Sequence, residues 1–258
     1  MNHDPVSPEG GRPLVGTVVS CADPALAESL AHAFDFVWID LEHGAITLRD
    51  MQTLTLAVQG RGCAAHVRLA RWDSEQLSAV LDAGVDGVVA PMVETGQEAT
   101  ALVRRLRYPP KGSRGFGPRR AGGYGRTGGY WASPEATVSC TVQVESSAAV
   151  DNVAAIAAVD GVDALVVGTA DLSLALGAPQ ELDAPVLRDA IGKVESAAAL
   201  DGVSFGIAAG GDPRAVRDLV ARPPRLVVYS VDLRLYAAAA DAAAAETRQA
   251  LEGIHVSA

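Results

Sequence analysis

The feature that most constrains this chain is a repeated alternation of short apolar runs with segments of helical spacing. The apolar runs predict eight strands, at 14–20, 36–41, 65–69, 87–93, 138–144, 162–167, 204–208 and 226–231. Apolar residues three and four positions apart predict helices at 24–33, 48–59, 74–84, 95–107, 146–158, 185–200, 213–221 and 235–254. Apolar strands joined by helical crossovers form a parallel sheet that helices cover on both faces.

Eight such units in 258 residues have the size of a closed (β/α)8 barrel, the TIM-barrel fold of the α/β class. A doubly wound open sheet is the alternative, but its dinucleotide-binding version carries a GxGxxG turn that the first strand here lacks. No change in composition marks a second domain, so we expect one catalytic barrel domain over 14–258. Residues 1–13 are polar and rich in Pro and Gly, and they predict a disordered leader rather than a signal peptide.

Charge and composition restrict the class of partner. A formal net charge of −10 argues against nucleic acid or an anionic membrane surface, since both need a basic face. No apolar run reaches the roughly 18 residues of a membrane span. Three scattered cysteines without a CxxC indicate neither a disulfide framework nor a thiolate metal site. The sequence therefore predicts a soluble, cytoplasmic protein and leaves a small-molecule substrate open.

Polar and ionisable residues follow four of the predicted strands where each strand ends. They are Asp40, Glu42 and His43, then Arg68, then Gln143 and Glu145, and finally Asp171. In a (β/α)8 barrel the carboxyl ends of the strands meet at one rim, and the chemistry takes place there. A single acid at a strand end is usually a helix cap or a solvated loop residue, but four strands with such groups indicate an active site.

The residue types at this rim suit metal-assisted proton transfer. Glu145 and Asp171 end neighbouring strands, so their carboxylates can converge on one hard divalent ion. Asp171 could instead cap the turn at 172–173. His43 is predicted to be a general base, and Asp40 could accept its second ring N–H and raise its basicity. The alternative for His43 is a loop histidine packed on the rim.

The lysines exclude one type of catalysis. A Schiff-base enzyme needs a lysine at the end of a strand. The chain has only Lys111, in a long loop, and Lys193, within a predicted helix. A Schiff-base mechanism is therefore excluded.

Four segments together resemble the HpcH/HpaI aldolases. These are metal-dependent (class II) pyruvate aldolases, and they include 4-hydroxy-2-oxoheptanedioate aldolase and 2-dehydro-3-deoxyglucarate aldolase. The segments are 36–44 (FVWIDLEHG), 107–115 (RYPPKGSRG), 142–145 (VQVE) and 168–173 (GTADLS), and they occur in the family order. The resemblance runs from about Leu14 to the last predicted helix.

This resemblance implies cleavage of a 4-hydroxy-2-oxo acid to pyruvate and an aldehyde, or the reverse addition, through a metal-bound pyruvate enolate. It makes Glu145 and Asp171 the ligands of Mg²⁺ or Mn²⁺, with Co²⁺ as a further possibility. Backbone N–H groups at Ala170 and Asp171 would hold the substrate carboxylate. Arg68 would hold the keto or enolate oxygen, and Gln143 would orient groups near the metal.

The resemblance also assigns the proton transfer and the assembly. His43 and Asp40 would move a proton at the substrate hydroxyl or at pyruvate C3, together with a metal-bound water. We interpret Glu42 as a bystander. The family implies a homo-oligomer, commonly a hexamer, in which the last helix packs on a neighbouring subunit.

Three departures from the family pattern leave the substrate open. The stretch 16–19 lacks the Trp that walls the pyruvate pocket in many members, and Thr169 replaces a usual proline. The glycine-rich stretch 111–134 carries Arg119, Arg120 and Arg126, which could receive a distal carboxylate or phosphate or belong to a lid or subunit contact.

Two other functions therefore stay open. One is a related metal–enolate enzyme, either a 2-oxo-acid decarboxylase or a macrophomate-synthase-like enzyme that forms C–C bonds. The other is a non-catalytic barrel that binds a metabolite.

Overall fold

The computed structural model describes residues 12–133, 136–208, 210–211 and 213–252. Its strands form a closed barrel in which each strand pairs in parallel with the next and β8 pairs with β1. They are β1 (Leu14–Val19), β2 (Phe36–Asp40), β3 (Ala64–Arg68), β4 (Gly87–Ala90), β5 (Ser139–Val144), β6 (Ala164–Gly168), β7 (Ser204–Ala208) and β8 (Leu226–Val231). The predicted (β/α)8 barrel is thus confirmed.

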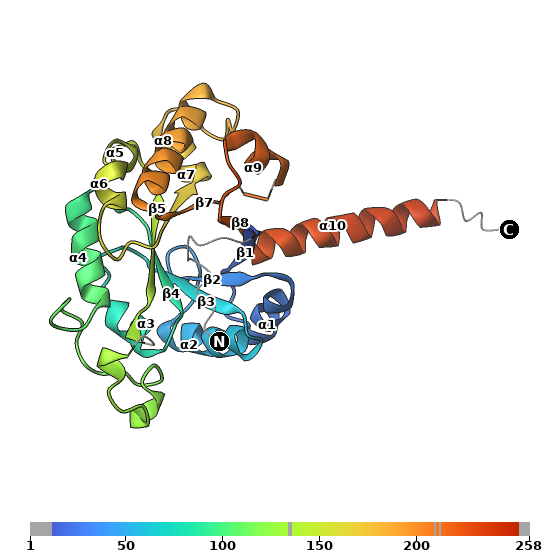
Figure 1. The fold of residues 1–258 in the computed structure, drawn as a ribbon. Helices are drawn as coiled ribbons and strands as arrows, with labels where there is room; N and C mark the ends of the chain where they lie inside the picture. Colours follow the sequence, from blue (N-terminus) through green and yellow to red (C-terminus); the bar gives the residue numbers. More distant parts are fainter. Residues whose placement is uncertain (1–11, 134–135, 209, 212, 253–258) are drawn as a thin grey trace.

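Helices surround the barrel (Figure 1). They are α1 (Pro24–Ala33), α2 (Leu48–Gly60), α3 (Leu77–Asp82), α4 (Gly96–Leu106), α5 (Ser147–Asp151), α6 (Val153–Ala157), α7 (Thr169–Ala175), α8 (Pro185–Asp201), α9 (Pro213–Leu219) and α10 (Asp232–Leu251). Two short 3-10 turns, η1 (Gly123–Gly125) and η2 (Tyr130–Ala132), lie in the long connection from α4 to β5. Of the leader expected at 1–13, residues 1–11 lie outside the described residues.

Three elements differ from the prediction. The helix expected at 146–158 is divided into α5 and α6, because the backbone of Asn152 leaves the helical conformation and its side chain donates to the Glu94 carbonyl at 2.9 Å. Strand β4 ends at Ala90, before Pro91, whose ring nitrogen cannot donate to a neighbouring strand. Helix α7 was not predicted, and it places the residues after β6 on a helical turn.

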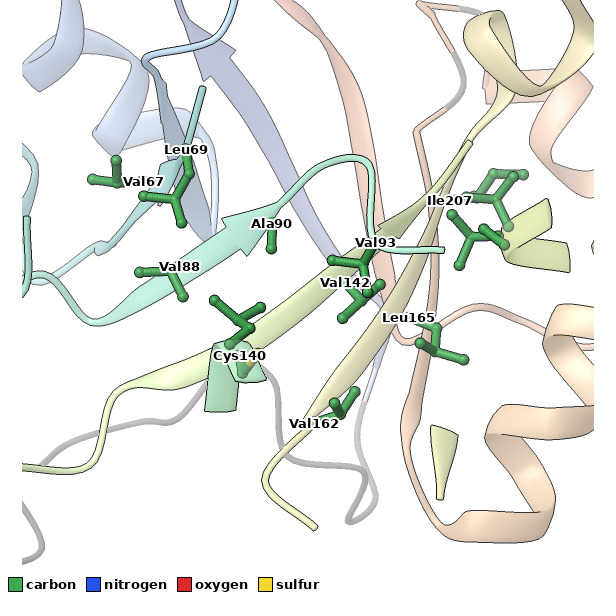
Figure 2. Packing of buried hydrophobic residues seen from close by; sticks show 14 of the residues in the cluster. Val67, Leu69, Val88, Ala90, Val93, Cys140, Val142, Val162, Leu165 and Ile207 are labelled. Atoms are coloured by element: carbon green, nitrogen blue, oxygen red, sulfur yellow. The ribbon is translucent and has the colours of Figure 1, made fainter. Parts of the chain in front are cut away.

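The larger core lies between the barrel and its helices. Figure 2 shows side chains on the outward faces of neighbouring strands, among them Val67, Val88, Val142, Leu165 and Ile207. All of these are fully buried, and burial of a Val, Leu or Ile side chain stabilises a fold by about 1.5–3 kcal/mol. This layer fixes the strands and therefore the rim at their carboxyl ends.

A second, smaller core fills the inside of the barrel. It includes Phe36, Trp38, Val166 and Val228. A Cβ at Gly16 would lie 2.2 Å from the Phe36 ring, so the close approach of β1 to this ring requires glycine. The filled interior leaves room for a ligand at the mouth, above Trp38.

Helix α10 leaves the barrel and projects away from it (Figure 1). Asp232 anchors its first turn by accepting hydrogen bonds from the Ser20 N–H, the Ser20 hydroxyl and the Cys21 N–H, at 2.6–2.9 Å. Asp232 is the one buried side chain of this helix among those described. Within the described ranges, no helix is both long and apolar enough to cross a membrane.

Candidate functional site

A cavity of about 240 Å³ opens at the carboxyl ends of the strands. Its lining comes from every strand except β4, and from the segments that follow β6, β7 and β8. Four residues expected at the site lie on its wall, namely Arg68, Gln143, Ala170 and Asp171. Trp38 of β2 forms part of the wall, and β1 contributes Val18.

A second hollow lies outside the barrel, between α4 and α6. It is open, and its lining residues, which include Thr95, Gln97 and Val159, carry no ionisable side chain. The barrel mouth is therefore the candidate site.

Asp40 and Arg68 form a buried ion pair at the mouth. The β2–β3 register sets the two residues side by side, and the guanidinium donates from Nε to Oδ1 at 2.9 Å and from Nη2 to Oδ2 at 2.6 Å. Asp40 Oδ1 also accepts the backbone N–H groups of Glu42 and His43, at 3.0 and 3.3 Å. Burial would raise the pKa of Asp40, but these hydrogen bonds and the Arg68 charge outweigh it and lower the pKa.

The expected hydrogen bond from the His43 ring to Asp40 is therefore not formed. The carboxylate is taken by a bidentate guanidinium from the adjacent strand, which is a stronger, charge-assisted partner. The predicted partner of His43 was wrong, but His43 still lies at the rim. Sequence spacing missed it because the choice of partner depends on strand register.

Glu42, interpreted above as a bystander, is the carboxylate that faces His43. Its Oε2 lies 3.7 Å from His43 Nε2 and 3.4 Å from Arg68 Nε. This oxygen accepts no hydrogen bond within the described part of the chain. Burial raises the pKa of Glu42, and the charges of Asp40 and Asp171 add to the effect. The His43 side chain is 66% exposed, which leaves it open to a ligand at the mouth.

Glu145 is held rigidly on the opposite side. Its Oε1 accepts the backbone N–H of Met92 at 2.8 Å, and its Oε2 accepts from Gln143 Nε2. Met92 adopts φ 57°, an unusual backbone conformation for a non-glycine residue that accompanies this contact. The pKa of Glu145 is raised by burial and by the nearby charges of Glu42 and Asp171. Gln143 therefore holds one oxygen of the Glu145 carboxylate, and the Met92 N–H holds the other.

Asp171 occupies the first turn of α7, directly after β6. It is exposed and lines the cavity together with Ala170. Thr169, which stands where the family pattern has proline, donates its hydroxyl to the Ala208 carbonyl at 2.7 Å and so ties the ends of β6 and β7 together.

These residues fit a hard divalent cation. Two carboxylates with raised pKa values and the charge of Asp171 repel one another, and a cation between Glu145 and Asp171 would relieve the repulsion. Gln143 Oε1 is buried and accepts no hydrogen bond in the portion described, so it can accept from a water on the ion. In the described ranges, no group of three or more His, Cys, Asp or Glu side chains is arranged to hold a metal ion.

The arginines of the stretch 111–134 lie elsewhere. Arg120 donates to the carbonyls of Ala83 and Gly84, at 3.0 and 3.1 Å, at the amino end of β4. The connection from α4 to β5 runs at that end of the barrel, so within this chain these arginines do not receive a distal anionic group at the mouth.

Comparisons with known proteins identify the family of the chain. The family model described as HpcH/HpaI aldolase/citrate lyase matches residues 15–239. The chain is 42% identical over 165 residues to a 4-hydroxy-2-oxovalerate aldolase of Novosphingobium aromaticivorans, a match that covers 63% of each chain. It is 35% identical over 243 residues to a hydroxypyruvate/pyruvate aldolase of Deinococcus radiodurans, covering 92% of this chain and 86% of the relative.

A solved structure also has a fold similar to that of this chain. It is that of an HpcH/HpaI aldolase/citrate lyase family protein from Burkholderia cenocepacia, which is 35% identical to this chain and superimposes with a TM-score of 0.87. The alignment covers 93% of this chain and 96% of that one. The predicted family is thereby confirmed.

Proposed function

The chain belongs to the HpcH/HpaI aldolase/citrate lyase family, and we propose that it is a divalent-metal-dependent carbon–carbon lyase. It cleaves a 4-hydroxy-2-oxo acid to pyruvate and an aldehyde, or joins the two. The observation that carries the proposal is that Arg68, Gln143 and Asp171 line one small cavity. Glu145 is hydrogen-bonded to Gln143, and the exposed His43 lies beside Glu42 at the same rim. Relatives named as pyruvate and 2-oxo-acid aldolases support it.

Glu145 and Asp171 are the residues that would hold Mg²⁺ or Mn²⁺, or alternatively Co²⁺. When bound, such an ion supplies Lewis-acid stabilisation of negative charge on the oxygens of a 2-oxo acid. The rigid hold on Glu145 by Met92 and Gln143 fixes one ligand in advance.

His43 is the proposed proton-transfer residue. In the cleavage direction it accepts the proton of the C4 hydroxyl, the C3–C4 bond breaks, and C4 leaves as the aldehyde carbon. The electron pair of the broken bond forms the enolate of pyruvate, which then takes a proton at C3. Glu42 is the carboxylate that faces the ring during the transfer, with its Oε2 3.7 Å from His43 Nε2.

Arg68 stabilises the enolate charge. Its Nε and Nη2 atoms are engaged by Asp40, which leaves Nη1 as the nitrogen that can contact the substrate C2 oxygen at the cavity wall. Because Asp40 fixes the guanidinium before substrate arrives, the electrostatic stabilisation needs little reorganisation. The backbone N–H groups of Ala170 and Asp171 are the proposed donors to the substrate carboxylate.

We also propose that the protein is a homo-oligomer, hexameric as the family resemblance implies. Helix α10 supports this, because it projects from the barrel (Figure 1) and leaves Leu233, Tyr236 and Leu251 exposed. A helix in water gains most of its stability by packing an apolar face, and a neighbouring subunit would provide the surface.

The test is an assay with pyruvate and a panel of aldehydes, with Mg²⁺ or Mn²⁺ and again with a chelator. We expect metal-dependent C–C bond formation, abolished by the chelator. His43→Ala should bind metal and pyruvate as before but lose about 10²- to 10⁴-fold in kcat, the usual contribution of a general base. His32→Ala, an exposed histidine on α1, is the matched control.

Three outcomes would count against the proposal. Oxaloacetate decarboxylation without aldol products would favour the decarboxylase alternative. No turnover and no divalent-ion binding would favour a metabolite-binding barrel. A His43→Ala variant with the full rate would refute the assignment of the base.

A further inference from the structure

A second arginine lies on the cavity wall, in an element that the proposed chemistry does not use. Arg234 belongs to the first turn of α10, and its Nη1 donates to the Gly210 carbonyl at 2.8 Å. This hydrogen bond joins the segment after β8 to the segment after β7. The guanidinium is thus fixed at the mouth, with its other N–H groups available to a ligand.

The charge of Arg68 is neutralised by a neighbouring carboxylate, whereas that of Arg234 is not neutralised within the described residues. Arg68 is neutralised by Asp40 at 2.6 Å and lies 3.4 Å from Glu42. Arg234 makes no ion pair with any residue in the described ranges. It is exposed, so binding an anion there costs little desolvation, and a planar guanidinium suits the two oxygens of a carboxylate or phosphate.

The residues beside Arg234 are small, which leaves space for a ligand next to its guanidinium. Gly210 and Gly211 both adopt positive φ, at 59° and 99°. A Cβ at Gly211 would lie 3.5 Å from Ser230 Oγ, and a Cβ at Gly210 would lie 3.6 Å from Arg234 Nη1. Ser230 itself lines the cavity. Segments after strands seven and eight are also where (β/α)8 barrels frequently bind anionic groups.

The acidic residues at the mouth give the Arg234 cation a role in binding an anionic substrate. Asp171 lines the cavity, and the carboxylates of Glu42 and Glu145 lie beside the lining residues Arg68 and Gln143. A substrate with a second anionic group would be repelled from the mouth unless a cation received that group. The cavity, at about 240 Å³, is below the roughly 300–1,000 Å³ of sites for drug-sized ligands, so the occupant is a short-chain compound.

We infer that Arg234, assisted by Ser230, selects the aldehyde by its charge, and that the preferred aldehyde carries a carboxylate or a phosphate. The inference rests on the proposed lyase function and adds the substrate class. Arg234 contacts the far end of the aldehyde fragment and takes no part in proton transfer or in C–C bond breaking.

The experiment compares matched aldehydes in the addition of pyruvate with Mg²⁺ present. Succinic semialdehyde is paired with butanal, and glyceraldehyde 3-phosphate with glyceraldehyde, so that the two pairs distinguish a carboxylate from a phosphate. We expect the wild type to favour the anionic member of at least one pair in kcat/KM. Arg234→Gln should lower kcat/KM for that aldehyde by about 10- to 100-fold, the effect of losing a hydrogen bond to a charged group, and leave the neutral partner unchanged.

Two controls isolate the charge. Arg234→Lys should retain part of the preference, because the charge remains while the bidentate geometry is lost. Arg248→Gln, in the last turn of the same helix, should match the wild type with all four aldehydes. Equal losses for anionic and neutral aldehydes in Arg234→Gln would show that the arginine only holds the segment at Gly210, and would overturn the inference.

Failure of the inference and failure of the proposed function give different results. Turnover of neutral aldehydes without preference for anionic ones overturns the inference and leaves the lyase function standing. If no aldehyde reacts, the proposed lyase function is wrong. Calorimetric titration with succinate and with inorganic phosphate then tests whether Arg234 binds an anion. Binding to the wild type that weakens in Arg234→Gln supports the site, whereas no binding or equal binding overturns it.

Discussion

At the scale of single residues, the Asp40–Arg68 pair connects the fold to the chemistry. Asp40 ends β2 and Arg68 ends β3, and the parallel register sets them opposite one another. The Arg68 side chain is 13% exposed and that of Asp40 is 2% exposed. A charge at such a site is tolerated only when its partner is present, since an uncompensated buried charge is costly.

We predict that Asp40→Ala destabilises the protein by about 3–5 kcal/mol, because it leaves the Arg68 charge buried without its partner. Urea unfolding, followed by circular dichroism, measures the loss. The double variant Asp40→Leu with Arg68→Met should recover most of it, since both charges are gone. Asp73→Ala, which breaks the exposed pair with Arg71, should change the stability little. If Asp40→Ala and Asp73→Ala lose equal stability, the pair is not a buried structural anchor.

A second residue-scale prediction concerns Glu145. Glu145→Gln keeps the size of the side chain and an acceptor for the Met92 N–H, and its new NH2 group can donate to Gln143 Oε1 once that amide turns over. It removes a charge that burial and neighbouring acids disfavour. We expect the variant to lose binding of Mn²⁺ in a calorimetric titration and, without metal, to be at least as stable as the wild type at pH 7.5. Glu28→Gln on the exposed surface of α1 should retain metal binding. Unchanged Mn²⁺ affinity in Glu145→Gln would refute its role as a ligand.

At the scale of elements, the strand order and the rim followed from the sequence, but the side-chain partners there did not. Apolar runs and turn residues locate β2 and its polar end, and topology then directs Asp40, His43, Arg68 and Glu145 to one rim. The partner of each side chain depends on register and rotamer, which periodicity does not encode. The His43 ring therefore faces Glu42 instead of Asp40.

The place of Arg234 on the last helix also could not be predicted from the sequence. The last helix was predicted to begin at 235, and it begins at Asp232, whose carboxylate accepts hydrogen bonds from Ser20 and Cys21. The three-residue difference moves Arg234 from a connecting segment into a helical turn at the cavity wall. The first turn of this helix is thus held by contacts that are distant in sequence, made with the residues that follow β1.

Helix α10 carries the prediction at this scale. Its 20 residues span roughly 30 Å, and its apolar side chains at Leu233, Tyr236 and Leu251 are exposed in the single chain. We expect Tyr236→Glu combined with Ala240→Glu to lower the molar mass in solution, measured by sedimentation equilibrium, because charge would be buried in a subunit contact. Asp241→Asn on another face of the helix is the control and should keep the wild-type mass. A wild type that sediments as a monomer would refute the homo-oligomer.

At the scale of the whole molecule, the acids divide into two groups with opposite effects on stability. Asp35 and Asp40 have lowered pKa values because arginines and backbone N–H groups stabilise their charged forms. Their contribution is present above the unfolded pKa of about 3.9 and is lost as the pH falls through their folded pKa. Glu42 and Glu145 have raised pKa values, chiefly through burial. Their ionisation therefore opposes folding at neutral pH.

These two groups predict an unusual pH dependence for the metal-free protein. As the pH falls from 7.5, Glu42 and Glu145 take up protons more readily in the folded than in the unfolded chain, whose glutamates titrate near 4.3. Stability should therefore rise on acidification until about pH 5, and fall only when Asp40 and Asp35 begin to lose their charge. Thermal unfolding in chelator at half-unit steps of pH measures it.

Saturating Mg²⁺ should reverse the trend over the same range. The ion binds the ionised carboxylates, so it should raise the Tm most at pH 7.5 and progressively less as protons compete for Glu145. The double variant Glu42→Gln with Glu145→Gln should show a flat profile between pH 5 and pH 7.5 with or without the ion. A metal-free Tm that falls steadily from pH 7.5 to pH 5 would mean that the acids at the mouth do not destabilise the fold. In that case repulsion between the carboxylates would not favour a cation between them.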